Sequence, residues 1–265
     1  MPVRDAQTDR DDTDLLTEAA RAAGEIALTF FRKDPRRWTK ENDSPVSEAD
    51  IAVDRHLEEL LRAARPGYGW LSEETADDRI RLEKRRSFVV DPIDGTRGFL
   101  AGSDEWTVAL AVVEDGRPVS AVVYRPVNGD LYRATLGSGT TLNGQSAAIS
   151  RRTALQGSSL AGPRTLSDGT KLEGHGLARI GYVPSLALRL AMVAAGRVDV
   201  AVARENACDW DLAAADLLVQ EAGGRLEDMS GTPLAYNRPS VRHPALLAGP
   251  PALVDPLRVL LADPG

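Results

Sequence analysis

The stretch from Glu105 to Pro126, EWTVALAVVEDGRPVSAVVYRP, constrains the fold of this chain more than any other. It contains two runs rich in valine and alanine on either side of Glu114-Asp115-Gly116-Arg117, and an Asp-Gly pair between two such runs is a strong signal for a β-hairpin. The next stretch, VNGDLYRA, carries Asn128-Gly129 and predicts a further turn and strand. The chain is therefore expected to contain an antiparallel sheet.

Apolar residues at helical spacing lie on both sides of this sheet-forming region. Residues 1–12 are predicted to be a solvated tail, and a polar loop is predicted between the first two helices. The predicted helices run from about Asp14 to Phe31, from Ser47 to about Ala64, from Pro184 to Ala195, from Cys208 to the pair Gly223-Gly224, and from Pro251 to about Leu261. Further strands are predicted at residues 87–91, where Pro92 removes a ladder donor, and at 197–204. Strand-rich and helix-rich blocks alternate, which indicates layered sheets and helices of the α+β or α/β class.

Bulk composition narrows the range of functions. Hydrophobic residues make up 43% and charged residues 27% of 265 residues, as in an ordinary globular protein. The net charge of −7 argues against binding a nucleic-acid polymer or an anionic membrane by bulk electrostatics. The single cysteine, Cys208, forms no internal disulfide, and neither a signal peptide nor a membrane span is visible. We expect a soluble cytoplasmic protein.

Acidic residues stand at the ends of three predicted elements. Glu73 follows the aromatic loop YGWLS, Asp91 and Asp94 bracket the end of a strand, and Asp211 opens a helix. Side chains at such ends can point at a shared centre, and carboxylate and carbonyl oxygens are the ligands that Mg²⁺ prefers. Zinc is a poor candidate because no cluster of cysteine and histidine is present.

The stretch DPIDGT, residues 91–96, predicts an anion site beside those acids. If a helix starts after Asp94, the amides of Gly95 and Thr96 lie at its N-terminus, where anions bind, and Arg97 adds positive charge at the rim. Acids that hold metal beside amides that hold an anion match metal-assisted phosphoryl hydrolysis.

Each of these stretches alone has a simpler interpretation. DPIDGT is often only a turn, SEE is usually a solvated acidic loop, and WDLAAADLL is usually a capped core helix. An aspartyl-phosphate mechanism of the haloacid-dehalogenase kind needs acids two positions apart, whereas Asp91 and Asp94 are three apart. None of the three histidines lies in the stretches DPIDGT, SEE or WDLAAADLL. The combination and order of the stretches, rather than any one of them, carry the hypothesis.

The combination resembles the inositol monophosphatase superfamily of Mg²⁺-dependent, lithium-sensitive phosphomonoesterases. The matching signatures are SPVSEADIAVDRHL, LSEE, DPIDGTRGF and WDLAAADLLVQEAGG, which lie between Lys40 and Gly224. The resemblance implies an α-β-α-β-α sandwich. It also implies two or three Mg²⁺ ions, inhibition by Li⁺, a small phosphorylated substrate and a homodimer. We place the boundary between an N-terminal half that carries most of the metal-binding loops and a C-terminal half that supplies Asp211 at residues 1–150 and 151–265.

The metal ligands that the resemblance implies are carried over by position. Glu73 would bind metal, and its neighbour Glu74 would lie behind it. Asp91 would bridge two cations, and the carbonyl of Ile93 would complete one of the two sites. Asp94 and Asp211 would bind the second cation.

The resemblance also implies how water and phosphate are held. Thr96 and Asp50 resemble the pair that positions and activates the nucleophilic water, and the amides of Gly95 and Thr96 would bind the phosphate. Lys40 resembles a lysine of the mobile loop near the metals. The catalytic residues are thus expected to be Asp50, Glu73, Asp94 and Thr96.

The substrate-binding residues differ between branches of the superfamily. Arg97 after DGT resembles the bisphosphate nucleotidases and histidinol phosphatases, although the nucleotidases usually carry glutamate where this chain has Gly98. Arg204 stands where inositol enzymes often place an acid, Arg189 falls where nucleotidases carry a basic residue, and an arginine suits a second phosphate. Glycine and serine usually occupy the stretch that here reads GYVPSLALRL.

We therefore expect a 3′(2′),5′-bisphosphate nucleotidase that converts 3′-phosphoadenosine 5′-phosphate to AMP. An inositol-1-phosphate phosphatase is the main alternative. A histidinol phosphatase ranks lower, because those enzymes typically start the last motif with Tyr-Asp. A metal-dependent regulatory protein without turnover is the non-enzymatic alternative.

Overall fold

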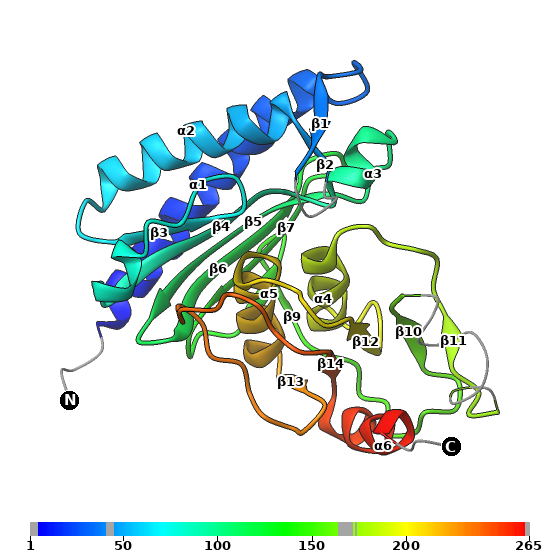
Figure 1. Cartoon of the computed structure of the whole chain (residues 1–265). Coiled ribbons are helices and arrows are strands. Elements are labelled where there is room, and N and C mark those ends of the chain that lie inside the picture. Colours follow the sequence, from blue (N-terminus) through cyan, green and yellow to red (C-terminus); the bar gives the residue numbers. More distant parts are fainter. Residues whose placement is uncertain (1–4, 41–44, 164–171, 173, 263–265) are drawn as a thin grey trace.

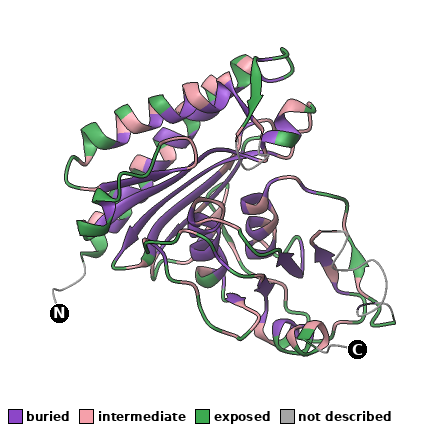
Figure 2. Ribbon diagram, in the orientation of Figure 1, coloured by how far each residue is buried: buried purple, intermediate pink, exposed green. Residues whose placement is uncertain are grey.

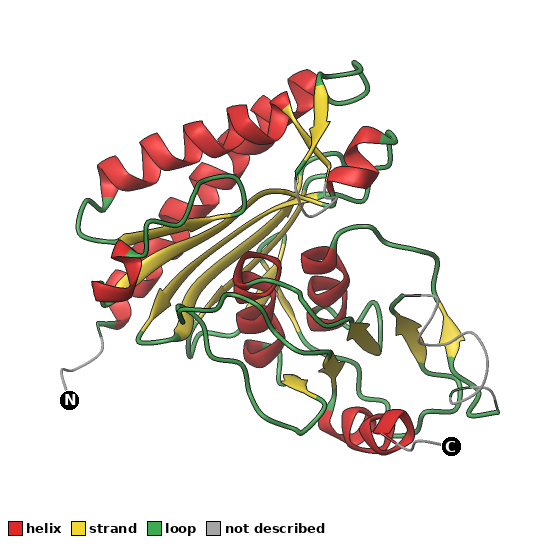
Figure 3. Ribbon diagram, in the orientation of Figure 1, coloured by secondary structure: helices red, strands yellow, loops and turns green. Residues whose placement is uncertain are grey.

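The structure is a computed structural model, and it describes residues 5–40, 45–163, 172 and 174–262. Within these ranges the helices and strands alternate in blocks (Figure 3). In chain order they are α1 (Ala6–Phe30), β1 (Arg37–Thr39), β2 (Pro45–Ser47), α2 (Glu48–Ala64), β3 (Gly69–Ser72), the 3₁₀ helix η1 (Ile80–Glu83), β4 (Arg86–Asp94), α3 (Thr96–Leu100), β5 (Thr107–Glu114), β6 (Arg117–Arg125), β7 (Asp130–Thr135), β8 (Thr140–Leu142), β9 (Gln145–Ala147), β10 (Ser159–Ala161), β11 (Ala178–Arg179), α4 (Leu186–Ala194), β12 (Val200–Ala203), α5 (Asp209–Glu221), β13 (Arg225–Asp228), β14 (Leu246–Gly249) and α6 (Pro251–Ala262).

Five layers stack through the molecule (Figure 1). α1 and α2 cover one face of a seven-stranded sheet of order β3-β4-β5-β6-β7-β8-β9, and α4 and α5 cover its other face. A five-stranded sheet of order β11-β10-β12-β14-β13 follows, with α6 packed against β14. The expected α-β-α-β-α sandwich is confirmed.

The predicted hairpin forms the centre of the large sheet. β5 pairs antiparallel with β6, and Glu114 lies opposite Arg117 across the Asp115-Gly116 turn. Along β5, Val108, Leu110 and Val112 point into the core under α1 and α2, while the residues between them face α4 and α5. The strands are therefore buried on both faces, as the purple strands of Figure 2 show. This double burial explains their nearly continuous apolar sequence.

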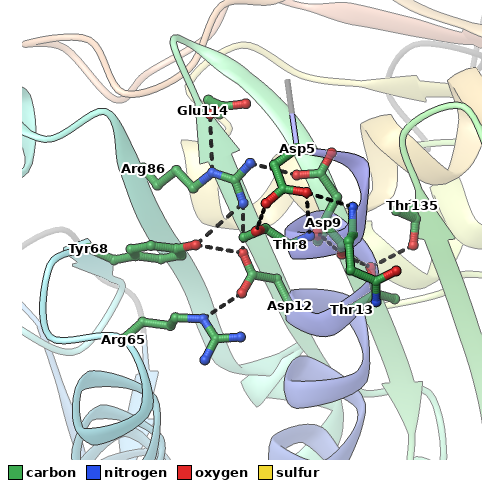
Figure 4. A network of polar contacts seen from close by, with 12 residues as sticks. Asp5, Thr8, Asp9, Asp12, Thr13, Arg65, Tyr68, Arg86, Glu114 and Thr135 are labelled. Carbon is green, nitrogen blue, oxygen red and sulfur yellow. Dashed lines mark hydrogen bonds and ion pairs between the residues drawn. The ribbon is translucent and has the colours of Figure 1, made fainter. Parts of the chain in front are cut away.

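The N-terminal tail prediction was wrong, because the helix begins at Ala6 rather than near Asp14. Asp9 and Asp12 are fully buried and pair with Arg86 of β4, at 2.7 and 3.0 Å (Figure 4). Tyr68 and Arg65 also contact Asp12, each at 2.8 Å. The acids that made the segment resemble a solvated tail are held by partners from distant parts of the chain.

Two boundaries near the motifs also differ from the predictions. The polar loop between the first two helices contains an antiparallel pair, β1 with β2. β4 does not end at Asp91 but continues through Pro92 to Asp94, with a shift of register between the two aspartates. Pro92 is tolerated because β3, the neighbour on that side, pairs with β4 only as far as Val90.

The two halves of the chain share buried contacts. One hydrophobic cluster joins Val89 and Ala111 of the large sheet to Leu188 of α4 and Leu217 of α5. The boundary between residues 150 and 151 stays a prediction. Among the described residues, no helix has the length and apolar character needed to cross a membrane.

Candidate active site

Three carboxylates from three elements meet at the end of the large sheet. Asp91 and Asp94 come from the last residues of β4, and Asp211 comes from the first turn of α5. Their ligand oxygens all lie within 4.8 Å of one another. Together with Glu73 they line a cavity of about 240 Å³. In a regular strand, two side chains three positions apart point to opposite faces of the sheet. The register shift between Asp91 and Asp94 interrupts this alternation, which accounts for part of the geometry.

The clustered acids interact unfavourably when no cation is bound. Burial raises the pKa of Asp91 well above its usual range, and the charges of Glu73, Asp94 and Asp211 raise it further. Burial likewise raises the pKa of Asp211, with Asp94 as the next contributor. Burial also raises the pKa of Asp94 to about 6, against opposing hydrogen bonds from Ser185 and from backbone amides. A bound cation would offset these costs.

The donor set fits Mg²⁺. It consists of hard carboxylate oxygens, and the carbonyl of Ile93 lies between the two aspartates in the chain. Cys208 precedes the first turn of α5 but is not part of the ligand group that the described residues form, and burial raises the pKa of its thiol to about 12. The arrangement therefore favours a hard cation over zinc.

Asp94 also anchors the N-terminus of α4. Its Oδ2 accepts hydrogen bonds from Ser185 Oγ at 2.5 Å and from the Ala187 amide at 2.6 Å, and its Oδ1 accepts from the Leu186 amide at 3.3 Å. A carboxylate at a helix N-terminus is stabilised by the otherwise unpaired amides and the helix dipole. These bonds tie one predicted metal ligand to the segment that begins α4.

The predicted water-activating pair is in contact. Thr96 Oγ1 lies 3.0 Å from Asp50 Oδ1 and 3.0 Å from the carbonyl oxygen of Ile93. The other oxygen of Asp50 accepts from the amide and hydroxyl of Ser47, at 2.8 and 2.6 Å, in a capping box that begins α2. Burial raises the pKa of Asp50. Asp50 is therefore a buried, oriented acceptor aimed at Thr96.

The two glutamates after β3 are held by Lys40. Its Nζ donates to Glu73 Oε1 at 3.0 Å and to Glu74 Oε1 at 2.7 Å. Burial raises the pKa of Glu74 to about 7, against the opposing Lys40 hydrogen bond. Glu73 lines the acidic cavity, whereas Glu74 is not among its lining residues. The metal-binding role of Glu73 and the supporting role of Glu74 stay predictions.

The loop that carries the glutamates is braced by Asp54, which sequence reasoning did not single out. Its carboxylate accepts from the hydroxyls of Ser72 and, at 2.6 Å, Thr75. Asp54 lies one helical turn after Asp50 on α2, within the stretch SPVSEADIAVDRHL. The signal available in the sequence was the spacing of four positions between Asp50 and Asp54, which places both acids on the same helix face.

Gly95, Thr96 and Arg97 also line the acidic cavity. Gly95 has φ +93°, and a Cβ there would meet the Ser185 amide nitrogen at 3.1 Å, so the position favours glycine. The helix that follows, α3, has only five residues, so its dipole contributes little to the anion site that the sequence predicted. Anion binding by the amides of Gly95 and Thr96 stays a prediction.

Gly98 packs closely against the ring of Pro184. A Cβ on Gly98 would lie 2.7 Å from Cγ of Pro184, so the ring of Pro184 occupies the space that a larger residue would need. The proline belongs to the stretch GYVPS, residues 181–185. Gly98 and Pro184 thus form one packed unit on the substrate side.

The remaining predicted substrate residues lie in an adjoining cavity of about 530 Å³. Arg189 and Arg204 line it, and it shares Asp94, Asp211, Tyr182 and Pro184 with the acidic cavity. Burial lowers the pKa of Arg189, while the charges of Asp94 and Tyr182 oppose this. The acidic cavity and the cavity lined by the arginines are therefore adjacent, and the residues they share separate them. Tyr182 was not predicted as a site residue.

Comparison with known proteins agrees with this geometry. The model of the inositol monophosphatase family matches residues 9–254. The chain belongs to this family. The family match extends from the first turn of α1 to the first turn of α6, and it includes every element that lines the acidic cavity.

Relatives with different names are similar to this chain. It is 33% identical over 231 residues to Nus factor SuhB of Xylella fastidiosa, covering 82% of each protein. It is 32% identical over 235 residues to the 3′(2′),5′-bisphosphate nucleotidase CysQ of Aggregatibacter actinomycetemcomitans, covering 83% of this chain and 86% of the relative. The solved inositol monophosphatase structure of Thermotoga maritima matches with a TM-score of 0.83 at 27% identity, over 96% of each chain. The comparisons show the family and its fold but leave the substrate open.

Proposed function

We propose that this protein is a Mg²⁺-dependent phosphomonoesterase. The observation that carries the proposal is the meeting of Asp91, Asp94 and Asp211 within 4.8 Å, beside the Gly95 and Thr96 amides on the same cavity. Members of the family are Mg²⁺-dependent phosphatases. Glu73, Asp91, Asp94, Asp211 and the Ile93 carbonyl would hold the ions. When bound, Mg²⁺ polarises the phosphate and lowers the pKa of water.

The residues of the chain would supply orientation and proton acceptance. Thr96 has one hydroxyl proton, and when it donates that proton to Asp50 its lone pairs face the cavity and can accept a hydrogen bond from water. Such a hydrogen bond would orient the attacking water, and the buried carboxylate of Asp50 could accept the proton that passes from that water through Thr96. The Gly95 and Thr96 amides stabilise the negative charge on the phosphate oxygens.

The neighbouring arginines favour a substrate with a second anionic group. Arg189 and Arg204 line the cavity that shares a wall with the acidic one. An ester whose reacting phosphate binds among the acids can therefore reach a guanidinium with its other end. 3′-Phosphoadenosine 5′-phosphate, hydrolysed to AMP, meets this requirement, whereas inositol-1-phosphate has no second anion for these arginines.

Phosphate release measured with and without Mg²⁺ tests the activity itself. The wild-type protein should release phosphate from 3′-phosphoadenosine 5′-phosphate with Mg²⁺ and release none with EDTA, and Li⁺ should inhibit the reaction. Asp211→Asn should be inactive. Asp115→Asn, an exposed acid on the distant β5–β6 turn, serves as the matched control and should retain activity. Activity that persists in EDTA, or in Asp211→Asn, contradicts the proposal.

A homodimer, a cytoplasmic location and the absence of nucleic-acid polymers among its partners remain predictions. Sedimentation of the purified protein tests the first of these. Inactivity towards every phosphomonoester, together with retained Mg²⁺ binding, would favour the alternative of a regulatory protein.

A further inference from the structure

Tyr182 stands at the junction of the two cavities. It lines both of them, together with Asp94, Pro184 and Asp211. Its side chain is large and apolar, yet 66% of the residue is exposed. Single exposed aromatic rings are common on protein surfaces, but an exposed ring that lines a polar cavity offers a ligand in that cavity a flat apolar face.

The other tyrosines of the chain have partners within the protein. The hydroxyls of Tyr68, Tyr132 and Tyr236 contact Asp12, Arg197 and Asp216, and Arg21 lies over the ring of Tyr124. Over the described ranges of the chain, the structure shows no comparable hydrogen bond or ring contact for Tyr182. Tyr182 lines the same cavity as Arg189 and Arg204, the arginines that we assign to the second anion. The ring therefore has no evident role in holding the fold together.

The backbone on which Tyr182 stands is anchored. Val183 is 4% exposed and belongs to the central hydrophobic cluster, and Pro184 packs against Gly98. Ser185 caps α4 and donates to Asp94. An exposed ring on a fixed backbone loses little conformational freedom when a ligand covers it, which favours binding.

We propose that Tyr182 is a stacking platform for a planar ring in the substrate. The substrate would then be a phosphate ester that carries an aromatic base as well as a second anion, which excludes sugar bisphosphates and inositol phosphates as preferred substrates. This inference rests on the phosphomonoesterase function proposed above. Stacking of a base on an aromatic side chain is worth about 1–3 kcal/mol, which corresponds to roughly 5- to 150-fold in affinity.

The test compares two bisphosphates that differ in the ring. KM is measured for 3′-phosphoadenosine 5′-phosphate and for fructose 1,6-bisphosphate with the wild type, Tyr182→Ala and Tyr182→Phe. Tyr182→Ala should raise KM for the adenosine compound about fivefold or more, the lower end of the range expected for stacking. The KM for the fructose compound should not change. Tyr182→Phe keeps the ring and should match the wild type. Trp38→Ala removes a 48% exposed ring that lines neither cavity, and it should change nothing.

Equal losses on both substrates, or no loss on either, would overturn the stacking role. A second readout separates this inference from the choice of substrate: inhibition of inositol-1-phosphate hydrolysis by AMP and by ribose 5-phosphate. If the wild type hydrolyses neither bisphosphate, stronger inhibition by AMP that disappears in Tyr182→Ala still supports the platform. Equal inhibition by the two compounds in the wild type overturns it.

Discussion

The hydroxyl oxygen of Thr96 lies 3.0 Å from Oδ1 of Asp50, although the two residues are 46 positions apart in the chain. Thr96 begins a short helix at the end of the large sheet, and Asp50 lies in the first turn of α2, a long helix that covers the sheet. The contact joins two sequence motifs into one proton-accepting pair. Because the contact uses the hydroxyl of Thr96 and not its amide, a mutation can remove the proposed orientation of water and leave the proposed binding of phosphate intact.

Thr96→Ala removes the hydroxyl and leaves the backbone amide that would bind phosphate. We expect kcat to fall by about 10²- to 10⁴-fold, the range of positioned proton-transfer groups, with KM nearly unchanged. Thr96→Ser keeps a hydroxyl and should retain most of the activity. Steady-state kinetics on both variants measure this. A rise in KM at unchanged kcat would mean that Thr96 only binds substrate.

Asp91→Asn removes the charge of a buried acid whose pKa is raised well above its usual range. Hydrolysis should fall by more than tenfold, about 1.4 kcal/mol of barrier, because the proposed bridging ligand is lost. In EDTA the variant should be at least as stable to urea as the wild type, because one of several repelling buried carboxylates has been neutralised. Retained activity above a tenth of the wild-type kcat, or a less stable metal-free protein, contradicts this account.

Arg204→Ala tests the second anion. Loss of a charge-assisted hydrogen bond costs about 1.5–3 kcal/mol, so KM for 3′-phosphoadenosine 5′-phosphate should rise at least tenfold or so. Hydrolysis of inositol-1-phosphate should change little. Arg189→Ala is the less selective change, because Arg189 also interacts with Asp94 and Asp211 and its loss should affect both esters. If Arg204→Ala affects both esters equally, the arginine has a structural role.

Asp216 predicts a pH dependence of stability that is independent of the metal site. Burial raises its pKa to about 6, against opposing hydrogen bonds from Gln220 and Tyr236. Because the folded-state pKa is raised, the protonated carboxyl contributes stability at low pH, and this contribution is lost as the pH rises from about 4 through 6. A shift of about two units corresponds to roughly 3 kcal/mol. The free energy of unfolding of Asp216→Asn relative to the wild type, measured in EDTA, should therefore increase from pH 4 to pH 7. A difference that is flat or falls with pH contradicts the assignment.

Much of the fold could be predicted because the decisive signals are local. The Asp115-Gly116 hairpin, the helical spacing in α2 and the glycine pair after α5 depend on neighbouring residues alone. The start of α1 could not be predicted in this way. Asp9 and Asp12 are compatible with a helix only because Arg86, more than seventy positions away, neutralises them in a buried site.

The residues of the candidate site also fall into two groups, those that local motifs predict and those that depend on distant contacts. Asp91, Asp94, Thr96 and Asp211 lie within compact motifs, and their convergence follows from standing at the ends of elements. Tyr182 and Ser185 lie in a stretch without a recognisable pattern, and their place on the cavity wall depends on how Pro184 packs on Gly98. Contacts of this kind depend on tertiary packing, which no local pattern encodes.

The central claim is that this site hydrolyses an ester with two anionic groups. The most direct measurement is kcat/KM for 3′-phosphoadenosine 5′-phosphate and for inositol-1-phosphate, with Mg²⁺, on one preparation of the wild-type protein. The account predicts a value at least tenfold or so higher for the adenosine bisphosphate, from the energy of one charge-assisted contact. An equal or higher value for inositol-1-phosphate would contradict it.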